Sequence, residues 1–108
     1  MRFAVIVVLV SVLCGCVITQ KSALVQARKS YAEKDYNACV SGVESALIDG
    51  EFVEEISSEL MFYKGLCLES AGRASEAIVF YKRAIDKYPD TDSALQAAVR
   101  LKKLAPAQ

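Results

Sequence analysis

The sequence predicts an all-α fold of about five helices packed as antiparallel pairs, and three observations support this prediction. Apolar residues recur at intervals of three and four, the helical period, and no sustained alternation of the strand kind occurs. No proline precedes Pro89, so nothing interrupts long helices before it. A pattern of residues also repeats at an offset of 38 positions, which indicates stacked helical units.

The first helix pair is predicted at residues 21–33 and 36–48. The turn between these helices contains Asp35, which can cap the second helix, and Asp49-Gly50 then ends that helix. Both helices have an apolar face at three- and four-residue spacing. These faces consist of Leu24, Ala27 and Tyr31 in the first helix and Cys39, Val43, Ala46 and Leu47 in the second.

The second helix pair is predicted at residues 52–70 and 75–87, separated by Ala71-Gly72 and ended by Pro89. A closing helix follows at residues 92–104. We expect Leu95, Ala98 and Leu101 to face inward from this helix and Arg100, Lys102 and Lys103 to face outward.

Two segments that align at the 38-residue offset carry the repeat. Residues 34–47 match residues 72–85, and each segment follows a helix with a small residue, Ala27 or Gly65, seven positions before the turn. This pattern resembles the tetratricopeptide repeat, a helix-turn-helix unit. The resemblance implies a right-handed superhelix, with repeat one at about 21–48, repeat two at about 52–89 and a closing helix. A generic five-helix bundle is the alternative, since the first repeat lacks the terminal proline and the period exceeds 34 residues.

The resemblance also implies a role for each matching side chain. Small residues in paired helices allow close approach, larger ones fill the space between those helices, and alanines contact the following helix. The small residues are Ala27, Gly65, Cys39 and Ala77, the larger ones are Val43 and Tyr81, and the alanines that contact the following helix are Ala46 and Ala84.

The N-terminus has the pattern of an export signal. Met1-Arg2 is followed by an apolar core of about eleven residues, which is short for a helix that crosses a bilayer of about 30 Å. Leu13-Cys14-Gly15-Cys16 resembles the bacterial lipobox. The resemblance implies that residues 1–15 are a signal peptide, that Cys16 carries the lipid and that residues 16–20 link it to a domain at 21–105. A single-span anchor and a plain secreted protein are the alternatives.

Val17 follows the cysteine where lipoproteins retained at the inner membrane have aspartate. The resemblance therefore implies the bacterial outer membrane, with a domain that faces the periplasm. Acyl chains on Cys16 would hold the protein there, because each buried methylene contributes about 0.8 kcal/mol.

Composition argues against an enzyme and against a nucleic-acid partner. The chain has no histidine, so it lacks the Ser-His and Cys-His nucleophile pairs and the imidazole metal ligands, and it has no Gly-rich phosphate loop. Its net charge of zero is not the basic balance of a nucleic-acid-binding domain. We expect no cofactor. The acidic residues between Ser41 and Tyr63 do not have the spacing of a calcium loop, so we expect no metal site and interpret them as a solvated turn and helix start. They are Glu44, Asp49, Glu51, Glu54, Glu55 and Glu59.

Proteins with such repeats bind peptides in a groove lined by the first helix of each unit. Tyr31 and Phe62 would anchor a peptide, and Arg28, Arg100 and Lys103 would bind its carboxylates. The alternative is that these charges only solvate an exposed face and that Tyr31 packs on the next helix. The full set is Leu24, Arg28, Tyr31, Glu59, Phe62, Leu66, Glu69, Gln96, Arg100 and Lys103.

Cys39 and Cys67 remain after processing, on two helices that are neighbours in the predicted fold. A disulfide between them is conceivable in an oxidising compartment. However, Cys39 stands where the repeat has a small buried residue, so the sequence favours two buried thiols.

The expected function is that of a protein or peptide interaction module, an adaptor or scaffold in envelope assembly, secretion, pilus biogenesis or cell-wall synthesis. Two repeats and a closing helix form a small core. A structural subunit that self-associates, for example as a homodimer, or completes a larger complex is therefore an alternative, and an accessory activator of a periplasmic enzyme is another.

Overall fold

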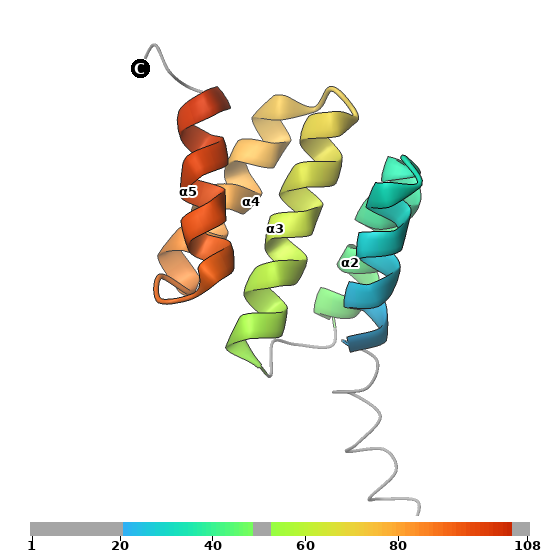
Figure 1. Cartoon of the computed structure of the whole chain (residues 1–108), viewed down its shortest axis with the longest axis horizontal. Helices are drawn as coiled ribbons and strands as arrows, with labels where there is room; N and C mark the ends of the chain where they lie inside the picture. The colour runs from blue at the N-terminus through green and yellow to red at the C-terminus, as the bar shows by residue number, and fades with distance from the viewer. Residues whose placement is uncertain (1–20, 49–52, 105–108) are drawn as a thin grey trace, which may run out of the picture.

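A computed structural model describes residues 21–48 and 53–104, which form helices joined by short turns (Figure 1). An N-terminal helical segment covers residues 21–32. It is followed by α2 (Tyr36–Ile48), α3 (Glu54–Ser70), α4 (Ala74–Lys87) and α5 (Asp92–Leu104). These ranges contain no strand. The predicted all-α fold of paired helices is confirmed, and the helix boundaries lie within about two residues of those expected from the sequence.

The helices lie in two layers. In Figure 1 the N-terminal helical segment (blue), α3 (yellow-green) and α5 (red) are nearest the viewer, and α2 and α4 lie behind them. The central helix, α3, packs against α2, α4 and α5. The front layer therefore consists of the first helix of each predicted pair together with the closing helix.

The 38-residue offset extends to backbone conformation. Lys34 and Gly72, which are equivalent under this offset, both have positive φ angles, of 63° and 82°. In each turn the following amide donates a hydrogen bond to the carbonyl five residues earlier, which satisfies a free carbonyl at the helix end. These bonds join Asp35 N to Ser30 O and Arg73 N to Leu68 O, each at 2.8 Å. The two turns therefore end their helices in the same way.

The core includes the residues that the repeat pattern selects. Tyr81 is fully buried, and its ring packs directly on Gly65. A Cβ at Gly65 would lie 2.4 Å from the Tyr81 Cε1 atom, so only glycine fits this crossing of α3 and α4. The other positions expected to be small or to fill the interior are also buried: Ala27, Cys39, Val43, Ala46, Ala77 and Ala84.

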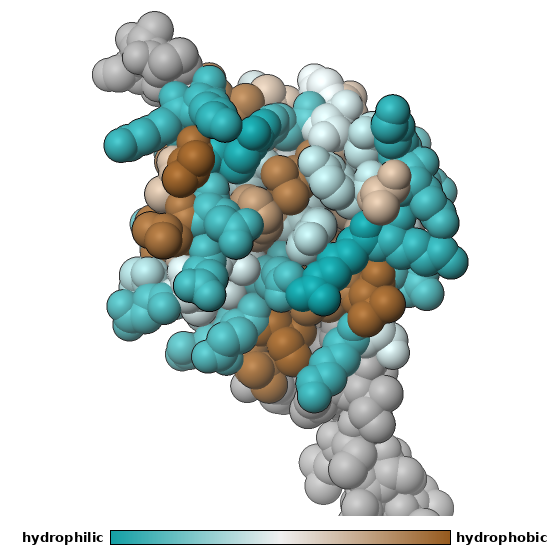
Figure 2. Space-filling view, in the orientation of Figure 1, coloured by the Kyte–Doolittle hydropathy of each residue, from teal (hydrophilic) through white to brown (hydrophobic). Residues whose placement is uncertain are grey.

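The expected orientation of α5 is partly wrong. Leu95 is 70% exposed, whereas Ala94 and Ala97 are buried. The small side chains of these alanines allow α5 to pack closely on its neighbours, and that leaves the larger Leu95 and Val99 outside. Figure 2 shows hydrophobic surface along the edge of the molecule that α5 forms. Arg100, expected to face outward, is partly buried and pairs with α3.

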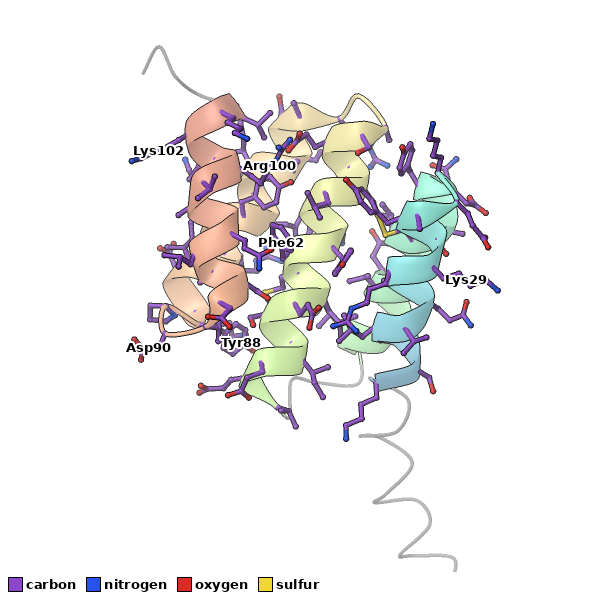
Figure 3. All side chains as sticks on the ribbon, in the orientation of Figure 1. Lys29, Phe62, Tyr88, Asp90, Arg100 and Lys102 are labelled. Carbon is purple, nitrogen blue, oxygen red and sulfur yellow. A yellow bond between two sulfur atoms is a disulfide. The ribbon has the colours of Figure 1, made fainter. Side chains whose placement is uncertain are left out.

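Cys39 and Cys67 form a disulfide between α2 and α3, where the sequence favoured two free thiols (Figure 3). Their Cα atoms are 6.3 Å apart, within the usual range for a disulfide. Both residues are buried, which is why the pattern alone does not separate a disulfide from two small hydrophobic side chains.

The predicted signal peptide, Cys16 and the linker at 16–20 lie outside the described residues. Across residues 21–48 and 53–104, no helix is both long and apolar enough to cross a membrane.

Candidate protein-interaction face

Most of the residues expected to bind a peptide lie on one surface, which we call the three-helix face because the N-terminal helical segment, α3 and α5 form it. On α3, Glu59, Phe62, Leu66 and Glu69 follow a spacing of three, four and three, so they form one stripe along the helix. This stripe is flanked by the two outer helices of the front layer (Figure 1). The predicted residues are thus brought together.

Two ion pairs span this face. Arg28 of the N-terminal segment pairs with Glu59, and Arg100 of α5 pairs with Glu69. In both pairs the arginine Nε lies 3.1 Å from a glutamate Oε1. The hydrogen bond to Glu59 raises the pKa of Arg28 above its usual value. Both arginines are therefore bound to carboxylates of the chain itself, and a ligand carboxylate would compete with Glu59 or Glu69.

Glu69 connects three helices. Its Oε1 atom accepts a hydrogen bond of 2.9 Å from the Tyr81 hydroxyl of α4, in addition to its pair with Arg100 of α5. Burial raises the pKa of Tyr81 well above its usual value, so the phenol keeps its proton and remains a donor. The sequence assigned Tyr81 only a space-filling role. Its hydroxyl was the available signal, because a buried Tyr hydroxyl usually has a polar partner.

The two expected aromatic anchors lie deeper than predicted. Phe62 is only 7% exposed, with ring centroids of Tyr63 and Tyr81 each 5.9 Å away (Figure 3). Tyr31 is partly buried and packs against Tyr36 and Tyr63. Phe62 belongs to the core and Tyr31 packs against it, so neither is a free anchor. Leu24 is buried too. Arg28, Gln96 and Lys103 are the exposed members of the predicted set, and Glu59, Leu66, Glu69 and Arg100 are partly buried.

A second cluster lies between α2 and α4 and was not predicted. The Lys64 side chain of α3 is only 10% exposed, and its Nζ atom lies 3.1 Å from a Glu44 carboxylate oxygen. The same Nζ lies 3.9 Å from the Phe80 ring centroid, and Arg83 stacks on that ring as well. These residues and Leu47 line a shallow hollow. No acidic residue stands three or four positions from Lys64, so the sequence offered no ion-pair partner for it on its own helix.

The acidic stretch is divided among several roles. Glu54 and Glu55 lie in the first turn of α3, where carboxylates interact favourably with the helix dipole. Glu44 and Glu59 are in ion pairs, and Asp49 and Glu51 lie outside the described residues. Within the part of the chain that the structure describes, no three potential metal ligands are grouped.

Comparisons with protein-family models, with curated proteins and with solved structures found no match to this chain.

Proposed function

We propose that this protein is a membrane-anchored protein–protein interaction module, an adaptor or scaffold of a bacterial envelope system. The observation that carries the proposal is the three-helix face, on which side chains of three separate helices form one surface with apolar and charged groups. Interfaces of this kind combine a small apolar centre with a polar rim.

The disulfide supports a location outside the cytoplasm. Structural disulfides persist in oxidising compartments such as the periplasm and are rare in the cytosol. A Cys39–Cys67 disulfide between two packed helices is consistent with the export and the lipidation at Cys16 that the sequence predicts. Together these features favour an exported domain held at the outer membrane.

The face suggests how a partner segment would bind. Leu66 is partly buried but more exposed than Phe62, the other apolar side chain of the α3 stripe, and it lies between the Arg28–Glu59 and Arg100–Glu69 pairs. An apolar side chain of the partner would cover Leu66. On either side of it, acidic groups of the partner would pair with Arg28 or Arg100, and basic groups would pair with Glu59 or Glu69. The favoured partner is therefore a protein segment with both charge signs around one apolar anchor.

Site-specific photocrosslinking in cells tests this proposal. A photoreactive residue at Gln96 would lie at the exposed edge of the three-helix face, and the same residue at Ser41, exposed on α2, would be the matched control. We expect one dominant product that joins this chain to a different protein from Gln96, and none in common from Ser41, with mass spectrometry to identify it. A product that contains only this chain does not count, because Gln96 also lies three or four positions from Asp92 and Val99 on α5.

A second variant separates binding from proximity. Leu66→Gln in the Gln96 background should remove the crosslinked product while the thermal unfolding midpoint shows that the domain stays folded. Equal products from Gln96 and Ser41, or a product that Leu66→Gln leaves unchanged in a folded protein, would refute the proposed role of the face.

A further inference from the structure

The outward side of α5 has a stripe of two apolar residues between two charged ones, and these four residues are not part of the three-helix face. Asp92, Leu95, Val99 and Lys102 follow a spacing of three, four and three, so they share one side of the helix. All four are exposed, with Leu95 at 70% and Val99 at 53%. The buried Ala94 and Ala97 lie on the opposite side, so this stripe points away from the core.

Leu95 and Val99 differ from isolated surface hydrophobic residues. Four large apolar residues are exposed among the described residues, and the other two, Val25 and Val79, lie singly on two other helices. Single exposed apolar residues are ordinary in soluble domains, whereas neighbouring ones indicate a contact surface. Leu95 and Val99 are four positions apart and therefore adjacent on the helix surface.

The order of the four residues is self-complementary. Suppose that a second α5 lies antiparallel to the first, with the two-fold axis on the exposed side at the level of position 97. Each residue then faces the residue of the second copy that lies equally far beyond this position in the sequence. Leu95 then faces Val99 of the second copy, and Asp92 faces Lys102. We propose that this protein forms a homodimer through antiparallel packing of α5 against α5 of a second copy.

Charge selects this arrangement over its parallel counterpart. Asp92 lies in the first turn of α5 and Lys102 in the last, and neither has an ion-pair partner within the described residues. Antiparallel packing brings opposite charges together at both ends, and parallel packing would bring like charges together. Like charges across an interface are unfavourable and specify orientation.

One helix from each copy gives a contact smaller than that of a standard stable interface. Such a dimer dissociates at roughly micromolar concentration or above. The inference goes beyond the proposed adaptor role and does not depend on it, since Leu66 and the two ion pairs of the three-helix face take no part.

Sedimentation equilibrium of the full chain in density-matched detergent tests the dimer. We expect a concentration-dependent monomer–dimer equilibrium that Leu95→Asp weakens by about tenfold or more, because a carboxylate would be buried against Val99. The matched control is Val25→Asp, which changes a valine of similar exposure, 58%, on the N-terminal helical segment and should leave the equilibrium unchanged.

A charge exchange tests the register. Asp92→Lys and Lys102→Asp should each weaken the dimer, and the double variant should restore it. The double variant places both charges at the unfavourable ends of the helix dipole, so restored dimerisation cannot come from a more stable helix. A monomer at all concentrations, as expected if the stripe binds a different protein, would overturn the proposal. So would a dimer insensitive to Leu95→Asp, or a double variant as weak as the single ones.

Discussion

Gly65 allows the ring of Tyr81 to pack directly on the backbone of α3, and this contact sets how closely α3 and α4 approach. Gly65→Ala should lower the free energy of unfolding by about 1–2 kcal/mol, because the gain in helix propensity is smaller than the strain of overpacking a buried ring. Gly42→Ala is the control, since its added Cβ would lie more than 4 Å from every atom beyond its chain neighbours and the nearby backbone of its own helix, and it should raise stability by about 0.5–1 kcal/mol. Chemical denaturation measures both values. Equal gains would show that α3 and α4 are not packed this closely.

Tyr81 makes stability depend on alkaline pH. Its folded-state pKa lies above the unfolded value of 10, mainly because burial disfavours the phenolate. Above pH 10 the unfolded chain loses this proton while the folded chain keeps it, so this contribution to stability is present below pH 10 and lost as pH rises. Tyr81→Phe should cost about 1.5 kcal/mol at neutral pH, through the lost hydrogen bond to Glu69, and should flatten the decline above pH 10. Denaturation at several pH values compares the two proteins, and an unchanged alkaline slope would contradict this explanation.

At the scale of elements, the disulfide fixes α2 against α3. It closes a loop with a sequence separation of 28, so its removal by Cys39→Ala with Cys67→Ala should lower stability by about 3 kcal/mol. Chemical denaturation measures this loss. Peptide mapping after alkylation of the unfolded, unreduced protein provides the chemical check, because a disulfide leaves both cysteines unmodified. Alkylation of both would restore the interpretation as two buried thiols.

The two equivalent turns should respond oppositely to substitution. Gly72→Ala places a Cβ at a positive φ and should lower stability by about 1 kcal/mol. Lys34→Gly removes the same strain at φ 63° and should raise stability by about 0.5 kcal/mol, since the greater entropy of glycine in the unfolded chain offsets part of the gain. Thermal unfolding of both variants is the measurement, and shifts in the same direction would contradict the equivalence of the turns.

The helices were predictable because their signals are local. Asp49-Gly50, Gly72 and Pro89 mark ends, and the small residues at 38-residue spacing identify the helix pairs. The orientation of α5 was not predictable, because two apolar faces compete and the choice depends on how closely Ala94 and Ala97 allow the helix to pack. The sequence could group the residues of the candidate face on neighbouring helices but could not give their mutual pairing, since Arg28–Glu59 and Arg100–Glu69 join residues 31 positions apart.

For the whole molecule we propose contacts at two neighbouring surfaces, a partner protein at the three-helix face and a second copy at the α5 stripe. Both lie on a domain that the sequence would place close to a membrane, because residues 17–20 span only about 13 Å when extended. The proposed compartment, and with it the class of partner, depends on the export and the lipid attachment at Cys16 that the sequence predicts.

Intact-mass spectrometry of the protein extracted from the membrane fraction is the direct test of signal-peptide removal and lipid attachment at Cys16. A lipid-anchored envelope protein should give a chain that begins at Cys16, carries acyl groups, and is lighter by two hydrogens because of the Cys39–Cys67 disulfide. Cys16→Ser should leave an unprocessed chain without lipid. A wild-type mass that corresponds to the full chain from Met1, or to a chain without acyl groups, would contradict the proposal of a lipid-anchored envelope protein.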